Sequence, residues 1–445
     1  MDFGTDSRSK YGWNTPVTAP GPEGGAMLRR LREIQHDPLG FLHESQQAFG
    51  DVVQFPIPKP ATYLVSSPQG ARDVLVTNHK LMSKRTVQYS TLALVTGEGL
   101  LTADTETWKT SRRQLAPAFH KEMLTLATDQ IATALRRLED RWLAETAVGS
   151  TIIDVDQTMM NLALEITGAT LFGADLTKQV DELTAATLRA LHGVVVRARS
   201  PLPIPLKLPT RNNLGMRQAI RKLDVAINAI IDQRLANPLP EGEPIRDMLD
   251  VLLDQTLEQP LSRRQIRDEV ATFIVAGHET IASALTWSWQ LLGENPDQRD
   301  LLRANPERAS QVFDEALRLY PPAWVITRRT LADVEIDDFL IPANALVIVS
   351  PWIVHRNSDV WTEPDKFNPD RFNAGIPQLG YLPFGTGPRL CIGRDLARLQ
   401  GAQILSQLSA NWRLDPIQTA QVPIEASVTL RPRGGLPMRL SRIAN

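Results

Sequence analysis

The sequence of 445 residues contains one cysteine, Cys391, so no disulfide can form within the chain and the disulfide-stapled class of secreted domains is excluded. It also lacks a long apolar run. The most apolar stretch, 339–354, is interrupted by two prolines, an asparagine and a serine, and fails as a membrane span of about 20 residues. Residues 1–25 show neither an export signal nor an anchor, and we expect a flexible segment there. We therefore expect a cytoplasmic protein with no membrane anchor.

An excess of charge of one sign is also missing. The 48 basic and 50 acidic residues give a net charge of −2, which argues against a nucleic-acid partner. The proline-rich stretches at 56–60, 201–209 and 237–244 are short and flanked by amphipathic segments, so they read as loops, and no internal repeat is found. With 42% apolar residues the chain can bury a large core, and we expect a single domain over 1–445.

The periodicity of apolar residues predicts a mainly helical fold with small β-sheets. Long helical patterns cover 107–143, 158–168, 217–237 and 263–292. Strand-like patterns cover 52–65, 345–349 and 428–440. The helix at 263–292 has a reciprocal cap in Ser262 and Gln265 and a stop in Gly293 and Pro296. Its largely apolar surface predicts that it crosses the core.

Cys391 lies in a glycine-rich loop, 384–393, that leads into a helical run at 394–408. The N-terminus of a helix lowers the pKa of a thiol, so this placement favours a thiolate. Gly387 and Gly393 allow the backbone to approach a flat ligand, and Arg389 can donate to an acidic group. The alternative is a buried structural cysteine in a turn, the usual fate of a lone thiol.

The loop resembles the haem-binding loop of the cytochrome P450 family, Phe-x-x-Gly-x-Arg-x-Cys-x-Gly, at every fixed position. In that family the cysteine thiolate is the proximal ligand of the haem iron. The resemblance implies a triangular, mainly helical P450 fold with small β-sheets and a haem b (iron protoporphyrin IX) bound through Cys391. It also implies that Phe384, Arg389 and Gly393 belong to the cofactor site.

The long helix carries a second motif, Ala276-Gly277-His278-Glu279-Thr280, that resembles the family's distal helix. A glycine inside a helix costs about 1 kcal/mol relative to alanine and calls for a packing or functional cause. We expect Ala276 and Gly277 to leave room for a ligand. Thr280 can bond to an upstream carbonyl and Glu279 supplies an exchangeable proton, so the pair is predicted to be a catalytic proton relay. His278 is expected to be a packed helix residue.

A third motif is predicted to be structural. Glu315 and Arg318 lie three residues apart on a predicted helix, where the alternative is an ordinary surface ion pair. The family resemblance joins them to Arg371 in the loop 367–372, to support the cysteine loop.

Partners for the two haem propionates are also carried over from the resemblance, because buried carboxylates need cationic or donor groups. The candidates are Trp108, Arg112, Arg328 (or its neighbour Arg329), His355 and Arg389.

The resemblance implies a monooxygenase that activates O2 with two electrons and oxidises a lipophilic small molecule of the fatty-acid or terpenoid type. The length leaves no room for a flavin or iron–sulfur module, so a ferredoxin or flavodoxin with its NAD(P)H reductase is expected as electron donor. A basic surface is predicted to steer that donor, formed by Lys109, Arg113, Lys121, Arg394 and Arg398. The alternatives are a peroxide-driven or isomerising haem-thiolate enzyme, a haem gas sensor or carrier, and a helical interaction protein without a cofactor.

Overall fold

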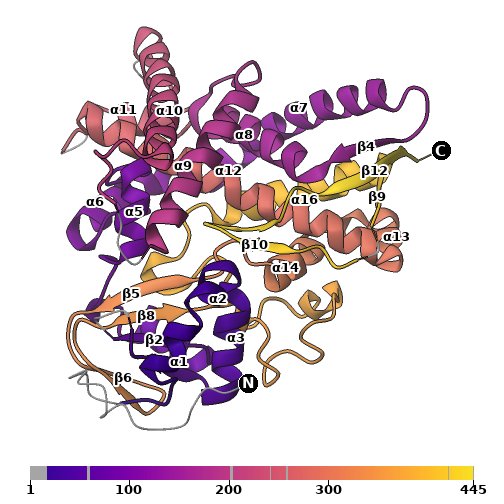
Figure 1. Ribbon diagram of the computed structural model, residues 1–445. Helices are drawn as coiled ribbons and strands as arrows, with labels where there is room; N and C mark the ends of the chain where they lie inside the picture. Colours follow the sequence, from indigo (N-terminus) through magenta and orange to yellow (C-terminus); the bar gives the residue numbers. More distant parts are fainter. Residues whose placement is uncertain are drawn as a thin grey trace. The chain divides into compact units, whose positions relative to one another are not determined.

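A computed structural model describes residues 18–57, 61–200, 204–240, 242–256, 259–418 and 420–443 (Figure 1). The chain forms two compact units. Unit 1 consists of residues 1–90, 318–366 and 375–391, and unit 2 of residues 91–317, 367–374 and 392–445. Of the N-terminal segment expected to be flexible, residues 1–17 lie outside the described residues, whereas Gly24 and Gly25 begin a helix.

Unit 1 is built on a five-stranded sheet with the order β1-β2-β8-β5-β3, in which only the β2–β8 pair is parallel. A separate hairpin is formed by β6 and β7. The strands are β1 (Val52–Phe55), β2 (Thr62–Val65), β3 (Met82–Ser83), β5 (Ile326–Thr330), β6 (Val334–Ile336), β7 (Phe339–Ile341) and β8 (Leu346–Val349). The helices are α1 (Gly24–Arg29), α2 (Leu31–His36), α3 (Pro38–Phe49), α4 (Pro68–Arg72), the π-helix η2 (Asp73–Thr77), α15 (Pro351–Val354) and the 3₁₀ turns η3 (His79–Leu81) and η7 (Gly387–Arg389).

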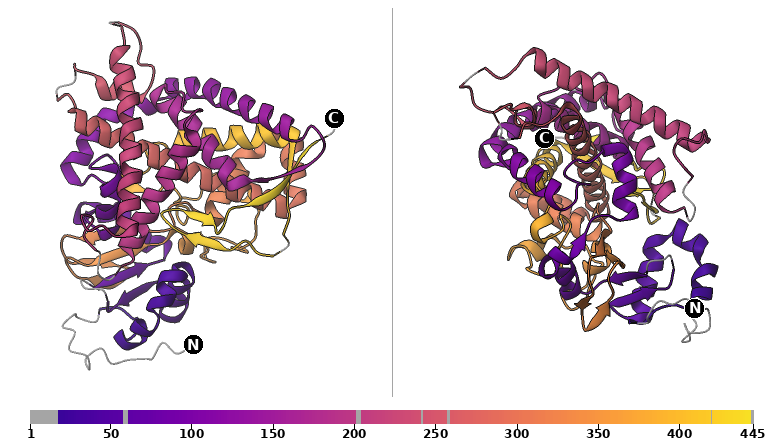
Figure 2. Two further views of the ribbon diagram at one scale, coloured as in Figure 1. Left: turned by 45° about the horizontal axis from the view of Figure 1, so that its top comes forward. Right: turned by 90° about the vertical axis from the view of Figure 1, so that its left-hand side faces the viewer.

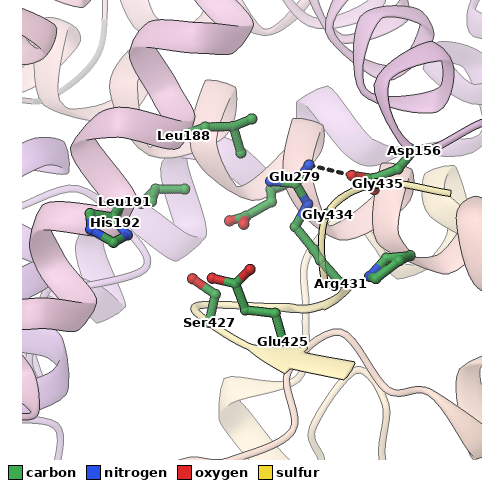
Figure 3. Close-up of a pocket in the computed structure, with 11 residues that line it drawn as sticks. Asp156, Leu188, Leu191, His192, Glu279, Glu425, Ser427, Arg431, Gly434 and Gly435 are labelled. Atoms are coloured by element: carbon green, nitrogen blue, oxygen red, sulfur yellow. Dashed lines mark hydrogen bonds and ion pairs between the residues drawn. The ribbon is translucent and has the colours of Figure 1, made fainter. Parts of the chain in front are cut away.

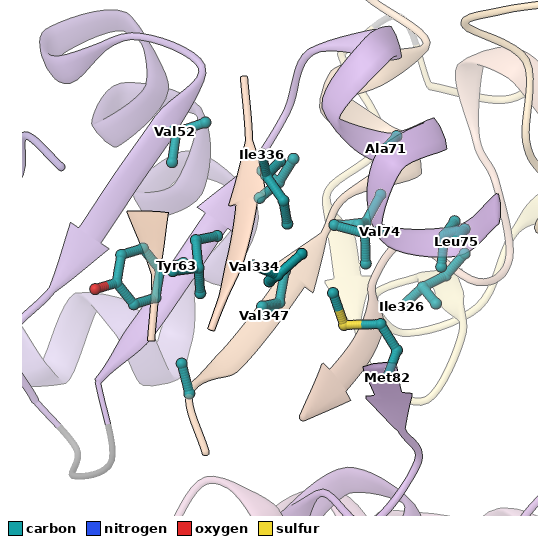
Figure 4. Packing of buried hydrophobic residues seen from close by; sticks show 14 of the residues in the cluster. Val52, Tyr63, Ala71, Val74, Leu75, Met82, Ile326, Val334, Ile336 and Val347 are labelled. Atoms are coloured by element: carbon teal, nitrogen blue, oxygen red, sulfur yellow. The ribbon is translucent and has the colours of Figure 1, made fainter. Parts of the chain in front are cut away.

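The core of unit 1 forms on one face of this sheet (Figure 4). The register places Tyr63 beside Val347 and Val65 beside Val349, and all four side chains are buried. Alternate residues of a strand point to the same face, so these pairs make one apolar surface. Val74 and Leu75 of η2 belong to the same cluster, which fixes η2 to the sheet.

Unit 2 is mainly helical (Figure 2). Its helices are α6 (Thr105–Leu115), α7 (Lys121–Glu145), α8 (Val155–Phe172), α9 (Val180–Ala198), α10 (Arg211–Ala236), α11 (Met248–Leu253), α12 (Arg263–Glu294), α13 (Pro296–Ala304) and α16 (Arg394–Asn411), with 3₁₀ turns η4 (Ala116–Phe119), η5 (Pro306–Arg308) and η6 (Pro369–Phe372). Helices α5 (Val87–Thr96) and α14 (Ala309–Leu319) have residues in both units. The strands β4 (Thr151–Asp154), β12 (Pro437–Arg442) and β9 (Trp412–Pro416) form one sheet, and β10 (Ile424–Ala426) and β11 (Leu430–Pro432) form a hairpin.

Helix α12 is the central element of unit 2. The expected capping box is present: Gln265 N–H is bonded to the Ser262 hydroxyl, and the Gln265 side chain accepts from the Ser262 backbone N–H. The helix ends at Glu294, two residues later than predicted, and its residues are mostly buried. It packs along α8, and α9 and α10 pack against each other. An apolar helix surrounded in this way gains most of its stability from packing.

The prediction of a mainly helical fold with small sheets is therefore confirmed, but individual helices differ from it. The helix predicted over 107–143 is interrupted at η4, where Pro117 lacks the N–H that a continuous helix needs. Helix α9 was not predicted at all. Only the proline-rich stretch that follows it, 201–209, was assigned, and it was predicted to be a loop.

Candidate active site

The cysteine loop of unit 1 is held by its own backbone. Cys391 N–H donates to the carbonyl oxygen of Phe384 at 3.0 Å, and Leu390 N–H donates to that of Gly387 at 3.0 Å. Cys391 is exposed and stands two residues before Gly393, the N-cap of α16. The loop thus presents a thiol at the start of a helix, as the sequence predicted.

Gly387 explains how this loop is fixed to the rest of unit 1. Its φ is +72°, and a Cβ at this position would lie 2.3 Å from the carbonyl oxygen of Leu75 in η2. Only glycine fits so close to another backbone. The structure thus shows a close approach of Gly387 to η2, and the close approach to a ligand that the sequence suggested stays a prediction. At Gly393 a Cβ would meet only the Phe119 ring at 3.7 Å, which is an ordinary contact.

The side chain of His355 is fully buried and bonds to the segment that precedes the cysteine loop. Its Nδ1 lies 2.9 Å from the carbonyl oxygen of Arg318, so Nδ1 carries the proton. Its Nε2 accepts from the backbone N–H of Leu382 at 2.8 Å. His355 therefore positions the segment that precedes the cysteine loop, and its contact with a propionate stays a prediction.

The Glu-x-x-Arg motif has the structural role that was predicted. The Arg318 guanidinium donates to the carbonyl oxygens of His355 at 3.0 Å and Pro364 at 2.5 Å. In unit 2, Glu315 is fully buried and its Oε1 accepts from Asn368 N–H at 2.8 Å and pairs with Arg371 Nε at 3.3 Å. Because Glu315 is buried, the alternative of a surface ion pair is wrong.

The remaining candidates for propionate contacts lie on both units. Arg328 of β5 is buried, and its Nη1 donates to the carbonyl oxygen of Thr327 at 2.8 Å. Arg328 forms no ion pair with any residue in the described ranges. The neighbouring Arg329 donates to Asn344 and to the Arg85 carbonyl instead, which favours Arg328. Half-buried side chains at three further positions complete the set: Trp108 and Arg112, one turn apart on α6, and Arg389 in η7.

The motif on α12 combines expected and unexpected features. The Thr280 hydroxyl donates to the Ala276 carbonyl oxygen at 2.6 Å, as predicted. His278 is fully buried, and burial lowers its pKa to about 3, so it is an uncharged packed residue. A Cβ at Gly277 would lie 3.2 Å from the Cγ2 and Oγ1 atoms of Thr167 on α8. The glycine therefore has a packing cause on the side of α8, and the room for a ligand that the sequence suggested stays a prediction.

Glu279 is the most perturbed acid of this motif. It is 2% exposed, and burial raises its pKa to about 7. The positive charge of Arg431 works against this shift, whereas Asp156 and Glu425 add to it. A carboxyl group with such a pKa is partly protonated at neutral pH, so it can both give and take a proton.

Glu279 faces a pocket of about 280 Å³ within unit 2 (Figure 3). Its carboxyl group points into the same space as Ser427 and Glu425 of the C-terminal hairpin. The lining consists of Asp156, Leu188, Leu191, His192, Glu279, Glu425, Ser427, Arg431, Pro432, Gly434 and Gly435. The sequence analysis missed Asp156, Glu425 and Arg431, because no motif links them to α12.

The comparisons with known proteins agree with this arrangement. A family model described as Cytochrome P450 matches residues 16–311 and 307–437. The chain belongs to the cytochrome P450 family. It is 30% identical to cyclooctatin synthase of Streptomyces melanosporofaciens, with 92% of each chain covered, and 29% identical to pentalenene oxygenase of Streptomyces avermitilis, with 94% of this chain and 96% of the relative covered. A crystal structure of CYP175A1 from Thermus thermophilus matches with a TM-score of 0.80 at 32% identity, covering 95% of this chain and 100% of the other.

Membership confirms the P450 fold, a monooxygenase-type enzyme and a thiolate-bound haem. Such a P450 needs a redox partner and a small-molecule substrate. None of the helices in the described part of the chain combines the length and the apolar character that a membrane span requires. The roles of the individual site residues stay predictions.

The raised pKa of Glu279 predicts a pH-dependent stability. Glu279 binds its proton more tightly when folded, with a pKa of about 7 against an ordinary value of 4.5. The free energy of unfolding should therefore fall as the pH rises through this interval, by about 3 kcal/mol for one such group. Glu269, whose pKa burial also raises to about 7, adds a decline of the same sign.

Urea unfolding of the Glu279→Gln variant between about pH 4 and 8 measures this effect. About half of the decline should disappear, because Glu269 still contributes its share. The matched control is Glu335→Gln, which changes an exposed glutamate of β6 and should leave the decline intact. An equal slope in both variants would contradict the prediction.

Proposed function

We propose that this P450 inserts one oxygen atom of O2 into a terpenoid, using two electrons from a separate ferredoxin or flavodoxin with its NAD(P)H reductase. The main observation behind the proposal is that the thiol of Cys391 is exposed on a loop that packs against η2 through Gly387. The substrate class is supported by the names of three relatives: cyclooctatin synthase, cyclooctat-9-en-7-ol 5-monooxygenase and pentalenene oxygenase. A cytoplasmic location and one functional domain over the whole chain remain part of the proposal.

The residues present suit a haem. A sulfur donor that is exposed at a helix start is a good ligand for iron, and when bound the haem supplies the activation of oxygen. Arg328 gives a second indication. A buried guanidinium without a carboxylate partner among the described residues is costly, and a cofactor that carries two carboxylates would relieve that cost. We assign Cys391 as iron ligand, with Phe384 and Gly393 in its loop, and Trp108, Arg112, Arg328 and Arg389 as propionate contacts.

On α12 we assign Thr280 and Glu279 as the proton relay. The Thr280 hydroxyl donates its hydrogen bond to the Ala276 carbonyl oxygen. The lone pairs of Oγ1 therefore stay free to accept a hydrogen bond from a neighbouring proton donor. Glu279 is the adjacent buried acid that can supply it, because it is partly protonated near pH 7. The chain thus provides both an acid and an alcohol on consecutive residues of one helix.

Ion pairs distinguish the five basic residues proposed to steer the electron donor. Arg398 forms an ion pair at 2.5 Å with Asp314, which is 3% exposed, so its first role is structural. Lys109 pairs with Glu106, and Arg394 with Asp395. Arg113 and Lys121 are exposed and form no ion pair with a residue of the described ranges, so they are the strongest candidates for steering an acidic partner.

Replacement of the cysteine tests the haem ligand. Cys391→Ala should remove the optical signature of thiolate-bound haem from the reduced, carbon monoxide-treated protein, because no other thiol exists in the chain. Thr386→Ser in the same loop is the matched control and should keep that signature. An unchanged spectrum in Cys391→Ala would overturn the assignment.

Replacement of the relay alcohol tests Thr280. In Thr280→Ala, product formed per NAD(P)H consumed should fall several-fold, with the lost electrons released as peroxide, because protons no longer arrive in order. The control is Ser288→Ala, which removes a hydroxyl bonded to its own upstream carbonyl at 2.7 Å on the same helix. If both variants uncouple equally, Thr280 has no special role.

The substrate class is tested by titration of the ferric protein. A cyclic terpene hydrocarbon should shift the Soret band at micromolar concentration, whereas a fatty acid of similar carbon number should need at least about tenfold more, a difference of 1.4 kcal/mol. The opposite order would refute the terpenoid assignment while leaving the monooxygenase assignment in place.

A further inference from the structure

The first half of α12 contains another buried acid, which the proposed relay does not use. Glu269 is 3% exposed, and its Oε2 accepts from the backbone N–H of Leu100 at 2.9 Å. The Ser111 hydroxyl on α6 also donates to this carboxyl group. Glu269 therefore joins α12 both to the segment that follows α5 and to α6 itself.

The segment that follows α5, residues 97–103, approaches α12 very closely. At Gly97, where φ is +67°, a Cβ would lie 2.1 Å from Cγ of Asp268. At Gly99 a Cβ would lie 2.2 Å from Oγ1 of Thr272. A side chain at either position would push the segment away from α12, so both glycines are needed for this approach.

Two backbone N–H groups of this segment bond to neighbouring acids of α12. Glu98 N–H donates to Oδ2 of Asp268 at 3.1 Å, and Leu100 N–H donates to Glu269. Asp268 also has a cationic partner, because its Oδ1 lies 3.0 Å from Nη1 of Arg267. Glu269 forms no ion pair with any residue that the structure describes. Hydrogen bonds alone must therefore stabilise its negative charge.

Helix α6 is the element whose position depends on these bonds. It carries Trp108 and Arg112, which we assign as propionate contacts, and Ser111 directly precedes Arg112 in the chain. The first residue of the helix is strained, since Thr105 has a φ of +42°, which a β-branched residue rarely adopts. A strained residue persists only where surrounding contacts hold it, and the bond to Glu269 is one such contact.

We propose that Glu269 is a positioning residue for haem binding: its carboxylate, bonded to Leu100 and Ser111, holds α6 where Arg112 meets a propionate. The inference rests on the proposed function, because it uses the assignment of Arg112. The bond between Glu269 and Leu100 lies within unit 2 and can be measured apart from the haem.

The two protonation states of Glu269 are close in free energy near neutral pH. Burial raises its pKa to about 7, the bonds from Leu100 and Ser111 act against this shift, and the charge of Asp268 adds to it. A hydrogen bond to an ionised acceptor is roughly twice as strong as one to a neutral acceptor. Protonation of Glu269 should therefore loosen both bonds, and with them α6.

Solvent can reach this region through a pocket of about 380 Å³. Its lining consists of Glu98, Thr107, Ser111, Leu261, Arg264, Gln265, Asp268 and Glu269. The charged groups that face Glu269 there are Glu98 from the segment 97–103 and Arg264 and Asp268 from the chain of α12, whereas α6 contributes hydroxyl groups. Exposed Glu98 lines the same pocket without bonding to Glu269, so it provides a matched control.

Hydrogen exchange of the holoenzyme follows the bond at Leu100 directly. The Leu100 amide, corrected for its intrinsic rate, should be protected at least severalfold less at about pH 6 than at about pH 8. In Glu269→Gln its protection should be low at both pH values, because the amide oxygen is a neutral acceptor. The Glu98 amide, which bonds to Asp268, is the internal reference and should keep its protection in this variant.

Transfer of haem to an excess of apomyoglobin measures the consequence for the cofactor. In the unmodified protein the release rate should be severalfold higher at about pH 6 than at about pH 8. Glu269→Gln should release haem at the higher rate at both pH values. Ser111→Ala should raise the rate at the higher pH, and Ser111→Thr, which keeps the hydroxyl, should retain the native rate. Glu98→Gln should show the native pH response.

Three results would overturn this role of Glu269. They are a native pH response of haem release in Glu269→Gln, a native release rate in Ser111→Ala, and an equal change in Glu98→Gln and Glu269→Gln. A general loosening of the fold would raise the rate in every variant but would leave its pH dependence in place. If the thiolate signature is absent from the unmodified protein, the proposed function fails. A normal signature with pH-independent haem release refutes only the role of Glu269.

Discussion

The placement of one sulfur atom is the constraint on which the chemistry of this protein depends. Cys391 can serve as a ligand only if its loop keeps the thiol exposed at a fixed position. The loop achieves this through the Cys391 to Phe384 backbone bond and through Gly387, which lies against the Leu75 carbonyl. Leu75 is itself part of the apolar cluster on the sheet of unit 1. The packing of the hydrophobic core of unit 1 therefore fixes the position of the Cys391 thiol.

The second constraint is the burial of acids in unit 2. Glu279 and Asp156 are both buried near one cation, Arg431, and the charge of that cation is shared between them. A buried carboxyl group ionises only when a partner compensates the loss of water. Two side chains of α12 donate hydrogen bonds to one carbonyl oxygen of the hairpin that carries Arg431. These bonds fix the position of the Arg431 charge relative to Glu279.

Much of the site was predictable because its signals are local. The cysteine loop, the capping box of α12 and the bond from Thr280 to Ala276 each involve residues within a few positions of one another. No helix was predicted where α9 lies, and the break at Pro117 was overlooked within a strong helical pattern. The second error concerns the end of an element, where periodicity carries little information.

The sequence by itself determined the type of ligand, the acid–alcohol pair and the mainly helical class, since spacing along the chain is enough to specify them. The tertiary structure alone decided the contacts of Gly277, His355 and Arg431. Gly277 packs against Thr167, the two nitrogens of His355 are taken by the backbone at Arg318 and Leu382, and Arg431 meets Asp156 across 275 positions of sequence. These contacts join segments whose proximity arises only when the cores form, so no local pattern records them.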